Sequence, residues 1–130
     1  MKIINKISFL LFYIANLALI IIYLYPGSIF GYFLYNDCLA QPQIITGSIT
    51  SIISFNHLFS FILISTLGIF AYRNSKKIKF LITYLFLISI VLELLHIIIP
   101  VRTFEWTDLI GNILGVTLIL IIYKIRDKYV

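Results

Sequence analysis

A few ionisable and amide side chains lie in or beside segments of this chain that are otherwise almost entirely apolar. Glu93 and His96 share one such segment, Arg102 follows it, and Asp108 and Asn112 open the next. A carboxylate, an imidazole or an amide inside hydrocarbon costs free energy unless another group pairs with it. These residues therefore indicate either contacts between helices or a site that binds or transforms a ligand.

Acid–base or metal chemistry is the catalysis that these residue types could support. Glu93 could act as a general base or a metal ligand, with His57, His96 and Asp108 completing the site. Glu-x-x-His is the spacing that di-metal helical bundles use, but those proteins need two such motifs and further carboxylates. Because the chain has one, the sequence predicts no metal and no cofactor, and it assigns no catalytic residue.

The composition is that of an integral membrane protein. The chain has 130 residues, of which 62% are hydrophobic and 12% charged, and its mean hydropathy is +1.09. A soluble domain of this length could not bury so much apolar surface. The net charge of +5 does not predict a nucleic-acid partner, because the basic residues cluster at the ends of apolar runs. A single cysteine, Cys38, excludes an intrachain disulfide.

Four apolar runs approach the roughly 20 residues that a helix needs to cross a bilayer. The predicted fold is an all-α bundle of four transmembrane helices within one domain, residues 1–130, with spans at about 7–25, 53–72, 80–99 and 108–123. The first run ends in Leu24-Tyr25-Pro26 without a small-x-small cleavage pattern, so we expect an uncleaved anchor. In the 26–52 loop, the aromatic stretch 29–35 is typical of a short interfacial helix or a re-entrant turn, and both remain open.

Basic residues set the expected orientation. The ten Lys and Arg residues divide unequally, and nine of them fall on one side of the predicted topology: Lys2, Lys6, Arg73, Lys76, Lys77, Lys79, Lys124, Arg126 and Lys128. The positive-inside rule then places both termini in the cytoplasm. We expect a multi-pass protein of the bacterial cytoplasmic (inner) membrane.

With this topology, the polar residues of three separate spans share one depth in the outer leaflet. At about 1.5 Å per residue, His57, Glu93, His96 and Asp108 all lie near the outer ends of their helices. Glu93 is the most demanding, since a carboxylate that deep must be protonated or paired. Its candidate partners are His57, His96, Arg102 and Asn112.

Structural roles are an alternative for each of these residues. Asp108 suits an N-cap, and Asn112 suits a hydrogen bond between helices. Arg102 and Glu105 could form a solvated loop pair, in which case substitution of Arg102 should cost little stability. Gly111 and Gly115 form a small-x-x-x-small pair, which predicts close helix packing.

The order of these residues resembles the VanZ-like family of small bacterial membrane proteins. The family pattern is a His-Phe near the start of one span, then Glu-x-x-Gln, Pro-x-Arg and Asp-x-x-x-Asn-x-x-Gly. The matching segments are His57-x-Phe59, Glu93-x-x-His96, Pro100-x-Arg102 and Asp108-x-x-x-Asn112-x-x-Gly115. The resemblance runs from His57 to the end of the fourth span.

This chain departs from the family pattern in four places. They are His96 for the family's Gln, Ile53 and Ser54 for its Asp-Lys, Leu58 inserted before Phe59, and Ile119 for a second glycine. The resemblance implies a protein of the cell envelope, since the family's namesake is associated with resistance to the glycopeptide teicoplanin.

Two functions of different classes follow from these observations. The first is binding of an amphiphilic or lipid-linked envelope molecule at the outer leaflet, by a cluster of His57, Glu93, His96, Arg102, Asp108 and Asn112. The alternative is an intramembrane enzyme that uses Glu93 with His57, His96 and Asp108 as acid–base groups or metal ligands. The expected partner is a membrane lipid or an envelope precursor. The sequence names neither the ligand nor an oligomeric state.

Overall fold

The structure is a computed structural model that describes residues 2–129, and it contains only helices and loops within that range. The helices are α1 (Lys2–Leu24), α2 (Ile29–Tyr35), α3 (Phe55–Tyr72), α4 (Ile78–Leu95) and α5 (Trp106–Tyr129), with a single 3₁₀ turn at Ser48–Ser51. By length and composition, α1, α3, α4 and α5 can each cross a membrane. The prediction of an all-α protein with four spans is confirmed.

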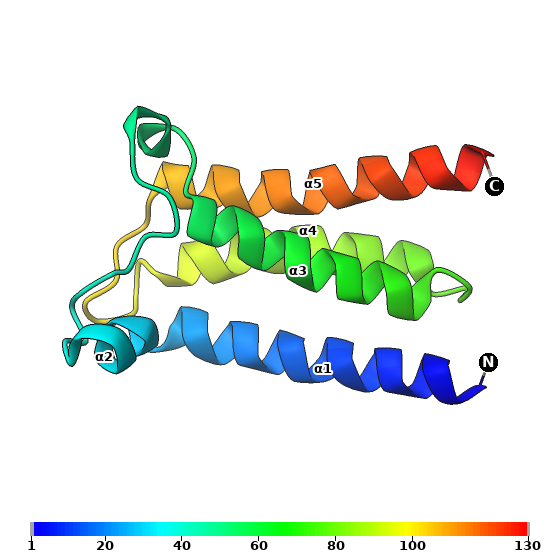
Figure 1. The fold of residues 1–130 in the computed structure, drawn as a ribbon, viewed down its shortest axis with the longest axis horizontal. Helices are drawn as coiled ribbons and strands as arrows, with labels where there is room; N and C mark the ends of the chain where they lie inside the picture. Colours follow the sequence, from blue (N-terminus) through cyan, green and yellow to red (C-terminus); the bar gives the residue numbers. More distant parts are fainter. Residues whose placement is uncertain (1, 130) are drawn as a thin grey trace.

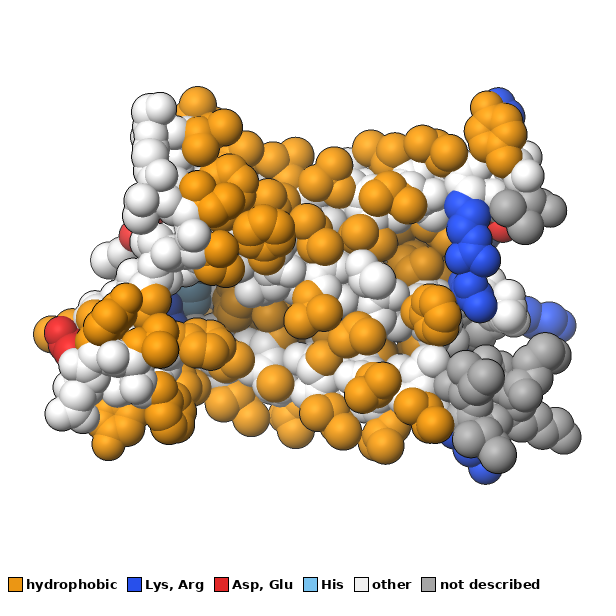
Figure 2. Space-filling view, viewed as in Figure 1, with side chains coloured by type: hydrophobic (Ala, Val, Ile, Leu, Met, Phe, Trp, Pro, Cys, Tyr) orange, Lys and Arg blue, Asp and Glu red, His pale blue; other side chains and the backbone are white. Residues whose placement is uncertain are grey.

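The four long helices run side by side, with both ends of the described chain at one end of the bundle (Figure 1). Large apolar side chains cover the visible flank of the helices, and Lys and Arg side chains gather at the end that holds the termini (Figure 2). Exposed apolar flanks are what a bilayer requires of helices whose backbone groups are paired internally. We call the opposite end, which carries α2 and the long loops, the loop end.

The contact between α3 and α5 is the most extensive in the bundle. Two glycines of α5 lie in it: a Cβ on Gly111 would be 2.6 Å from the carbonyl oxygen of Ser54, and one on Gly115 would be 2.7 Å from that of Leu58. Any larger residue would push the two backbones apart. The pair thus sets the distance between α3 and α5 near the loop end.

The ends of α4 and α5 differ from the predicted spans. The third span ends at Leu95 instead of residue 99, because Pro100 has no N–H to donate to the carbonyl of His96 and the chain tightens into i→i−3 turns before it. The fourth helix is longer than the predicted 108–123 at both ends. It continues to Tyr129 because Arg126 and Lys128 in its last turn interact favourably with the helix dipole.

The other two predicted spans need smaller adjustments. The first, 7–25, lies within α1 except for Tyr25, which follows the helix before Pro26. The second begins at Phe55 instead of residue 53, because Ser54 is the N-cap and its backbone N–H donates to the carbonyl of Thr107 at 3.1 Å.

The loop between α1 and α3 folds back over the loop end. Its aromatic stretch forms the short helix α2, capped by the Ser28 hydroxyl, which accepts the Gly31 N–H at 2.9 Å. Further along, the Asn56 amide at the start of α3 donates to the Pro42 carbonyl at 2.6 Å and accepts the Ile44 N–H at 2.9 Å. These bonds hold the loop against the first turn of α3.

Candidate functional site

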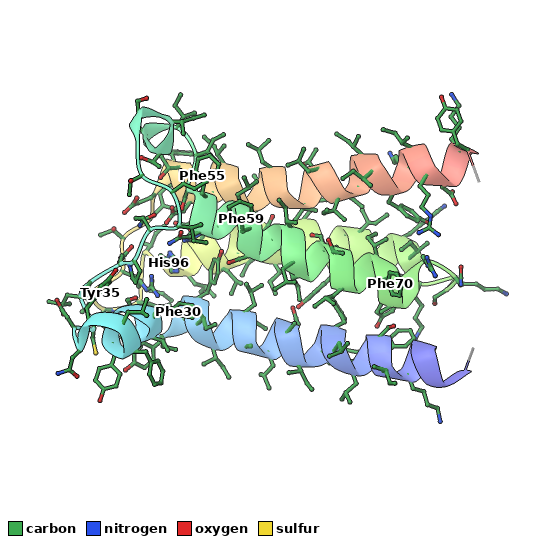
Figure 3. The ribbon with its side chains drawn as sticks, viewed as in Figure 1. Phe30, Tyr35, Phe55, Phe59, Phe70 and His96 are labelled. Atoms are coloured by element: carbon green, nitrogen blue, oxygen red, sulfur yellow. The ribbon has the colours of Figure 1, made fainter. Side chains whose placement is uncertain are left out.

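The polar residues predicted from the sequence meet at the loop end of the bundle. His57 is in the first turn of α3, Glu93 in the last turn of α4, and Asp108 and Asn112 in the first two turns of α5. His96 follows α4 as its C-cap, and Figure 3 shows it at the loop end, near α2. Three helices thus bring these five side chains together.

Glu93 is fully buried, and only one of its carboxylate oxygens is satisfied. Oε1 accepts the backbone N–H of Glu105 at 3.0 Å and lies 3.4 Å from Nδ1 of His96. Oε2 has no hydrogen-bond partner and lies 3.7 Å from Nδ1 of His57. The side chain is therefore held through one oxygen and presents the other, with free lone pairs, to the site.

Asn112 joins all four long helices. Its amide oxygen accepts the hydroxyl of Tyr23 on α1 at 3.0 Å and lies 3.1 Å from Nδ1 of His57 on α3. Its amide nitrogen donates to the carbonyl of Ser89 on α4 at 3.1 Å. Since a carbonyl can only accept, this last bond fixes which end of the amide faces His57.

The orientation of Asn112 determines the hydrogens of His57. Nδ1 of His57 faces an amide oxygen, so it carries a hydrogen and donates. In the neutral ring, Nε2 then has only a lone pair, and it lies 3.2 Å from Oδ2 of Asp108. Two lone pairs at that distance repel each other unless a proton or another cation lies between them.

His96 is buried between α1 and α4. Its Nε2 lies 3.0 Å from the carbonyl oxygen of Tyr23, so Nε2 carries a hydrogen, and its ring stacks on the Tyr23 ring at 6.0 Å between centroids. Nδ1 lies 3.4 Å from Oε1 of Glu93. His96 therefore anchors Glu93 and ties the end of α4 to α1.

Arg102 is half-buried and hydrogen-bonded to backbone carbonyls. The sequence had also allowed a solvated loop residue paired with Glu105, and the structure differs from that alternative. Its Nε donates to the carbonyl of Tyr25 and its Nη2 to that of Ile22, both at 3.2 Å. These carbonyls have no partner within α1. Burial lowers the pKa of the Arg102 guanidinium, while the charges of Asp108 and Glu93 raise it, and an arginine remains charged at neutral pH. In place of the expectation that its substitution costs little stability, the structure predicts a loss.

The proposed pair between Arg102 and Glu105 is also not formed in the described part of the chain. The Glu105 carboxylate instead faces the Thr107 hydroxyl at 3.5 Å. The backbone of Glu105, through its N–H, is the part that contacts the site.

Two cavities share His57, Asn56 and Gln41 as lining residues, and we call this shared wall the junction. The larger, about 350 Å³, has mostly apolar walls, and the smaller, about 260 Å³, is mostly polar. The larger is lined by Ile22, Tyr23, Ser28, Ile29, Phe30, Leu34, Gln41, Pro42, Ile44, Asn56, His57, Ser60, His96 and Arg102. The smaller is lined by Gln41, Gln43, Ile45, Thr46, Thr50, Ser54, Asn56, His57, Glu105, Thr107 and Asp108. The Arg102 guanidinium thus borders the apolar cavity, and the Asp108 carboxylate borders the polar one.

Comparison with known proteins identifies the family. The family model described as VanZ/LLP1 matches residues 6–127. The chain belongs to the VanZ/LLP1 family. This confirms the family predicted from the sequence and extends the match through α1. No curated protein and no solved structure matches this VanZ/LLP1 chain.

Sequence reasoning missed three contributors to the site of this VanZ/LLP1 protein. Tyr23 was not singled out, because a tyrosine near the end of a span is ordinarily an interface anchor. Its only signal was its depth, which equals that of the cluster. The Glu105 N–H is a backbone group and has no sequence signature. Asn56, which secures the loop beside both cavities, could have been found as the polar neighbour of His57.

Proposed function

We propose that this VanZ/LLP1 protein binds an anionic amphiphile at the outer face of the bacterial cytoplasmic membrane. The single observation that carries the proposal is the junction of an apolar and a polar cavity at His57. An amphiphile has an apolar chain joined to a polar head group, so its binding site needs an apolar and a polar region within the length of one molecule. Its chain would occupy the apolar cavity and its head group would lie at the junction.

The Arg102 guanidinium favours an anionic head group. It keeps its charge beside the apolar cavity, and the imidazoles of His57 and His96 line the same space as further hydrogen-bonding groups. A guanidinium recognises a phosphate or carboxylate through charge-assisted hydrogen bonds. Lipid-linked envelope precursors have this chemistry, and the proposal includes a link to glycopeptide resistance of the teicoplanin type, which the family resemblance supports.

The test compares two lipids that differ only in the head group. Purified protein is titrated with a polyprenyl phosphate and with the polyprenol of equal length, and bound lipid is measured by native mass spectrometry. We expect the phosphate to bind at least about tenfold more tightly, since a charge-assisted contact contributes about 1.5–3 kcal/mol. Equal binding of the two lipids would contradict an anionic ligand.

A pair of matched phenylalanine variants locates the lipid chain. Phe30 borders the apolar cavity, whereas Phe70 lies at the opposite end of the bundle (Figure 3). Both rings are about half exposed, so both substitutions should preserve the fold. Phe30→Ala should weaken binding of both lipids, and Phe70→Ala should not. Equal effects would place the lipid chain outside this cavity.

An intramembrane enzyme is the second candidate, and the free Oε2 of Glu93 is the observation that favours it. A buried carboxylate oxygen without a partner can accept a proton from a bound substrate or water. Incubation of the protein with the same polyprenyl phosphate, followed by mass analysis of the lipid, separates the two candidates. A new product that Glu93→Gln abolishes would establish catalysis, and an unchanged lipid would leave binding alone.

A further inference from the structure

Three possible metal ligands from three helices converge beside the cavities. One nitrogen of His57, one oxygen of Glu93 and one oxygen of Asp108 all lie within 4.8 Å of one another. Glu93 is buried, and His57 and Asp108 are half-buried. The cluster thus combines one imidazole and two carboxylates in a setting that is largely shielded from water.

Two atoms of this cluster lack a hydrogen-bond donor or a cation as a partner among the described residues: Oε2 of Glu93 and Nε2 of His57. Oε2 of Glu93 is fully buried and makes no hydrogen bond. Nε2 of His57 has a lone pair in the neutral ring and faces the carboxylate of Asp108 at 3.2 Å. A single cation bound among the three residues would satisfy both and would remove the repulsion between His57 and Asp108.

The remaining atoms of these residues are held as in known metal sites. A histidine that binds a metal almost always donates its other N–H to an oxygen, and Nδ1 of His57 faces the Asn112 amide oxygen at 3.1 Å. Carboxylate ligands are likewise fixed by hydrogen bonds, and Oε1 of Glu93 accepts the Glu105 N–H. Outer contacts therefore hold two of the three ligands in place.

We propose that His57, Glu93 and Asp108 form a mononuclear site for a divalent transition metal, with Zn²⁺ as the best-fitting ion. Imidazole and carboxylate together suit Zn²⁺, and three protein ligands leave a fourth position open. Tetrahedral zinc with bonds of about 2.0–2.1 Å places its ligand atoms about 3.4 Å apart, so a small movement of the side chains closes the site.

This site differs from the di-metal motif weighed in the sequence. Glu93 and His96 have the Glu-x-x-His spacing, but Nε2 of His96 is bonded to the Tyr23 carbonyl and Nδ1 is directed at Glu93. The third ligand instead comes from α5. His57 lines both cavities and Asp108 lines the polar one, yet the metal site does not depend on lipid binding.

The experiment measures zinc binding to the full chain in detergent. The protein is purified without a polyhistidine tag, stripped with EDTA, and titrated with Zn²⁺, with bound metal determined by mass spectrometry. Three variants are compared with the wild type: Glu93→Gln, Asp108→Asn and Asp127→Asn. The last is the control, an identical change on the same helix at the far, exposed end.

We expect about one Zn²⁺ per chain for the wild type and Asp127→Asn, since four-coordinate zinc fits three ligands and one water. The two site variants should bind at least about tenfold more weakly. Zn²⁺ should also raise the melting temperature of the wild type and Asp127→Asn but not that of the two site variants, because a ligand that binds the folded state stabilises that state. Asp108 is half-buried, so its variant tests the site even if Glu93→Gln does not fold.

Absence of stoichiometric zinc in the wild type, or equal affinity in all four proteins, would overturn the proposal and leave a proton as the cation between His57 and Asp108. Lipid titration is a separate measurement. Zinc binding without lipid binding would overturn the proposed function but support the metal site. Lipid binding without zinc binding would support the proposed function and overturn the metal site.

Discussion

Nε2 of His57 lies 3.2 Å from Oδ2 of Asp108, across the most extensive helix contact in the protein. The distance depends on Gly111, which is one turn after Asp108 on α5 and packs against His57 on α3: a Cβ there would lie 3.2 Å from the Cβ of His57 and 2.6 Å from the Ser54 carbonyl. Helix packing and the geometry of the site are therefore coupled.

Gly111→Ala should destabilise the protein by about 1–3 kcal/mol, because the added methyl overlaps backbone that cannot rotate away. The measurement is thermal unfolding in detergent. Gly68→Ala is the matched control, since a Cβ there would meet side chains of Phe12 and Leu81, the nearest atom at 3.0 Å. It should cost clearly less, and an equal loss would show that the contact between α3 and α5 is not specially tight.

Arg102→Gln should lower the free energy of unfolding by about 1.5–3 kcal/mol, because the guanidinium bonds to the Tyr25 and Ile22 carbonyls are charge-assisted. Arg102→Lys should recover only part of this, since an ammonium lacks the planar fork. Denaturant unfolding with circular dichroism provides the comparison. Arg73→Gln, at the opposite end, should change little, and wild-type stability of Arg102→Gln would contradict this capping role.

Tyr23→Phe removes one hydroxyl and keeps the ring that packs on His57 and His96. Asn112 then loses one of its three bonds, so we expect a stability loss of about 1 kcal/mol or less. Tyr25→Phe, two residues on and 40% exposed, is the control and should be neutral. If both tyrosines behave alike in thermal unfolding, the bond to Asn112 contributes nothing.

Both termini and the turn between α3 and α4 should face the cytoplasm. The structure places these parts at one end of the bundle, and the basic residues there set the direction. Alkaline phosphatase, which is active only outside the cytoplasm, should be inactive when fused after Tyr129. The same reporter inserted near Gly47, in the loop end, should be active. The reverse pattern would invert the topology.

The fold was predictable because long apolar runs in the sequence indicate membrane-spanning helices. Runs such as Phe80 to Leu95 are too apolar for any setting but a bilayer, and only helices of that length can span it. The end of α4 was less predictable: Pro100 marks a limit, but the number of i→i−3 turns before it, which ends the helix at Leu95, has no sequence signature.

For the candidate site, depth in the membrane and helix spacing were enough to predict which residues lie together. Glu93 and His96 had to be neighbours at i and i+3, and His57 and Asp108 had to lie near the same membrane surface. The choice of partners was not predictable. Arg102 could equally have reached Glu93, and its bonding to α1 instead follows from the path of the 96–105 loop, which is set by contacts far apart in the sequence.

The bond from the Glu105 N–H to Glu93 has a consequence for biogenesis. Helices leave the ribosome in chain order, so α4 reaches the membrane before α5 can supply the contacts of Asn112. At that stage Glu93 must be protonated or paired with His96, its neighbour on the same helix. Arrival of α5 completes the network, so a chain that stops before Trp106 keeps in the bilayer a costly polar group that the finished protein buries between its helices.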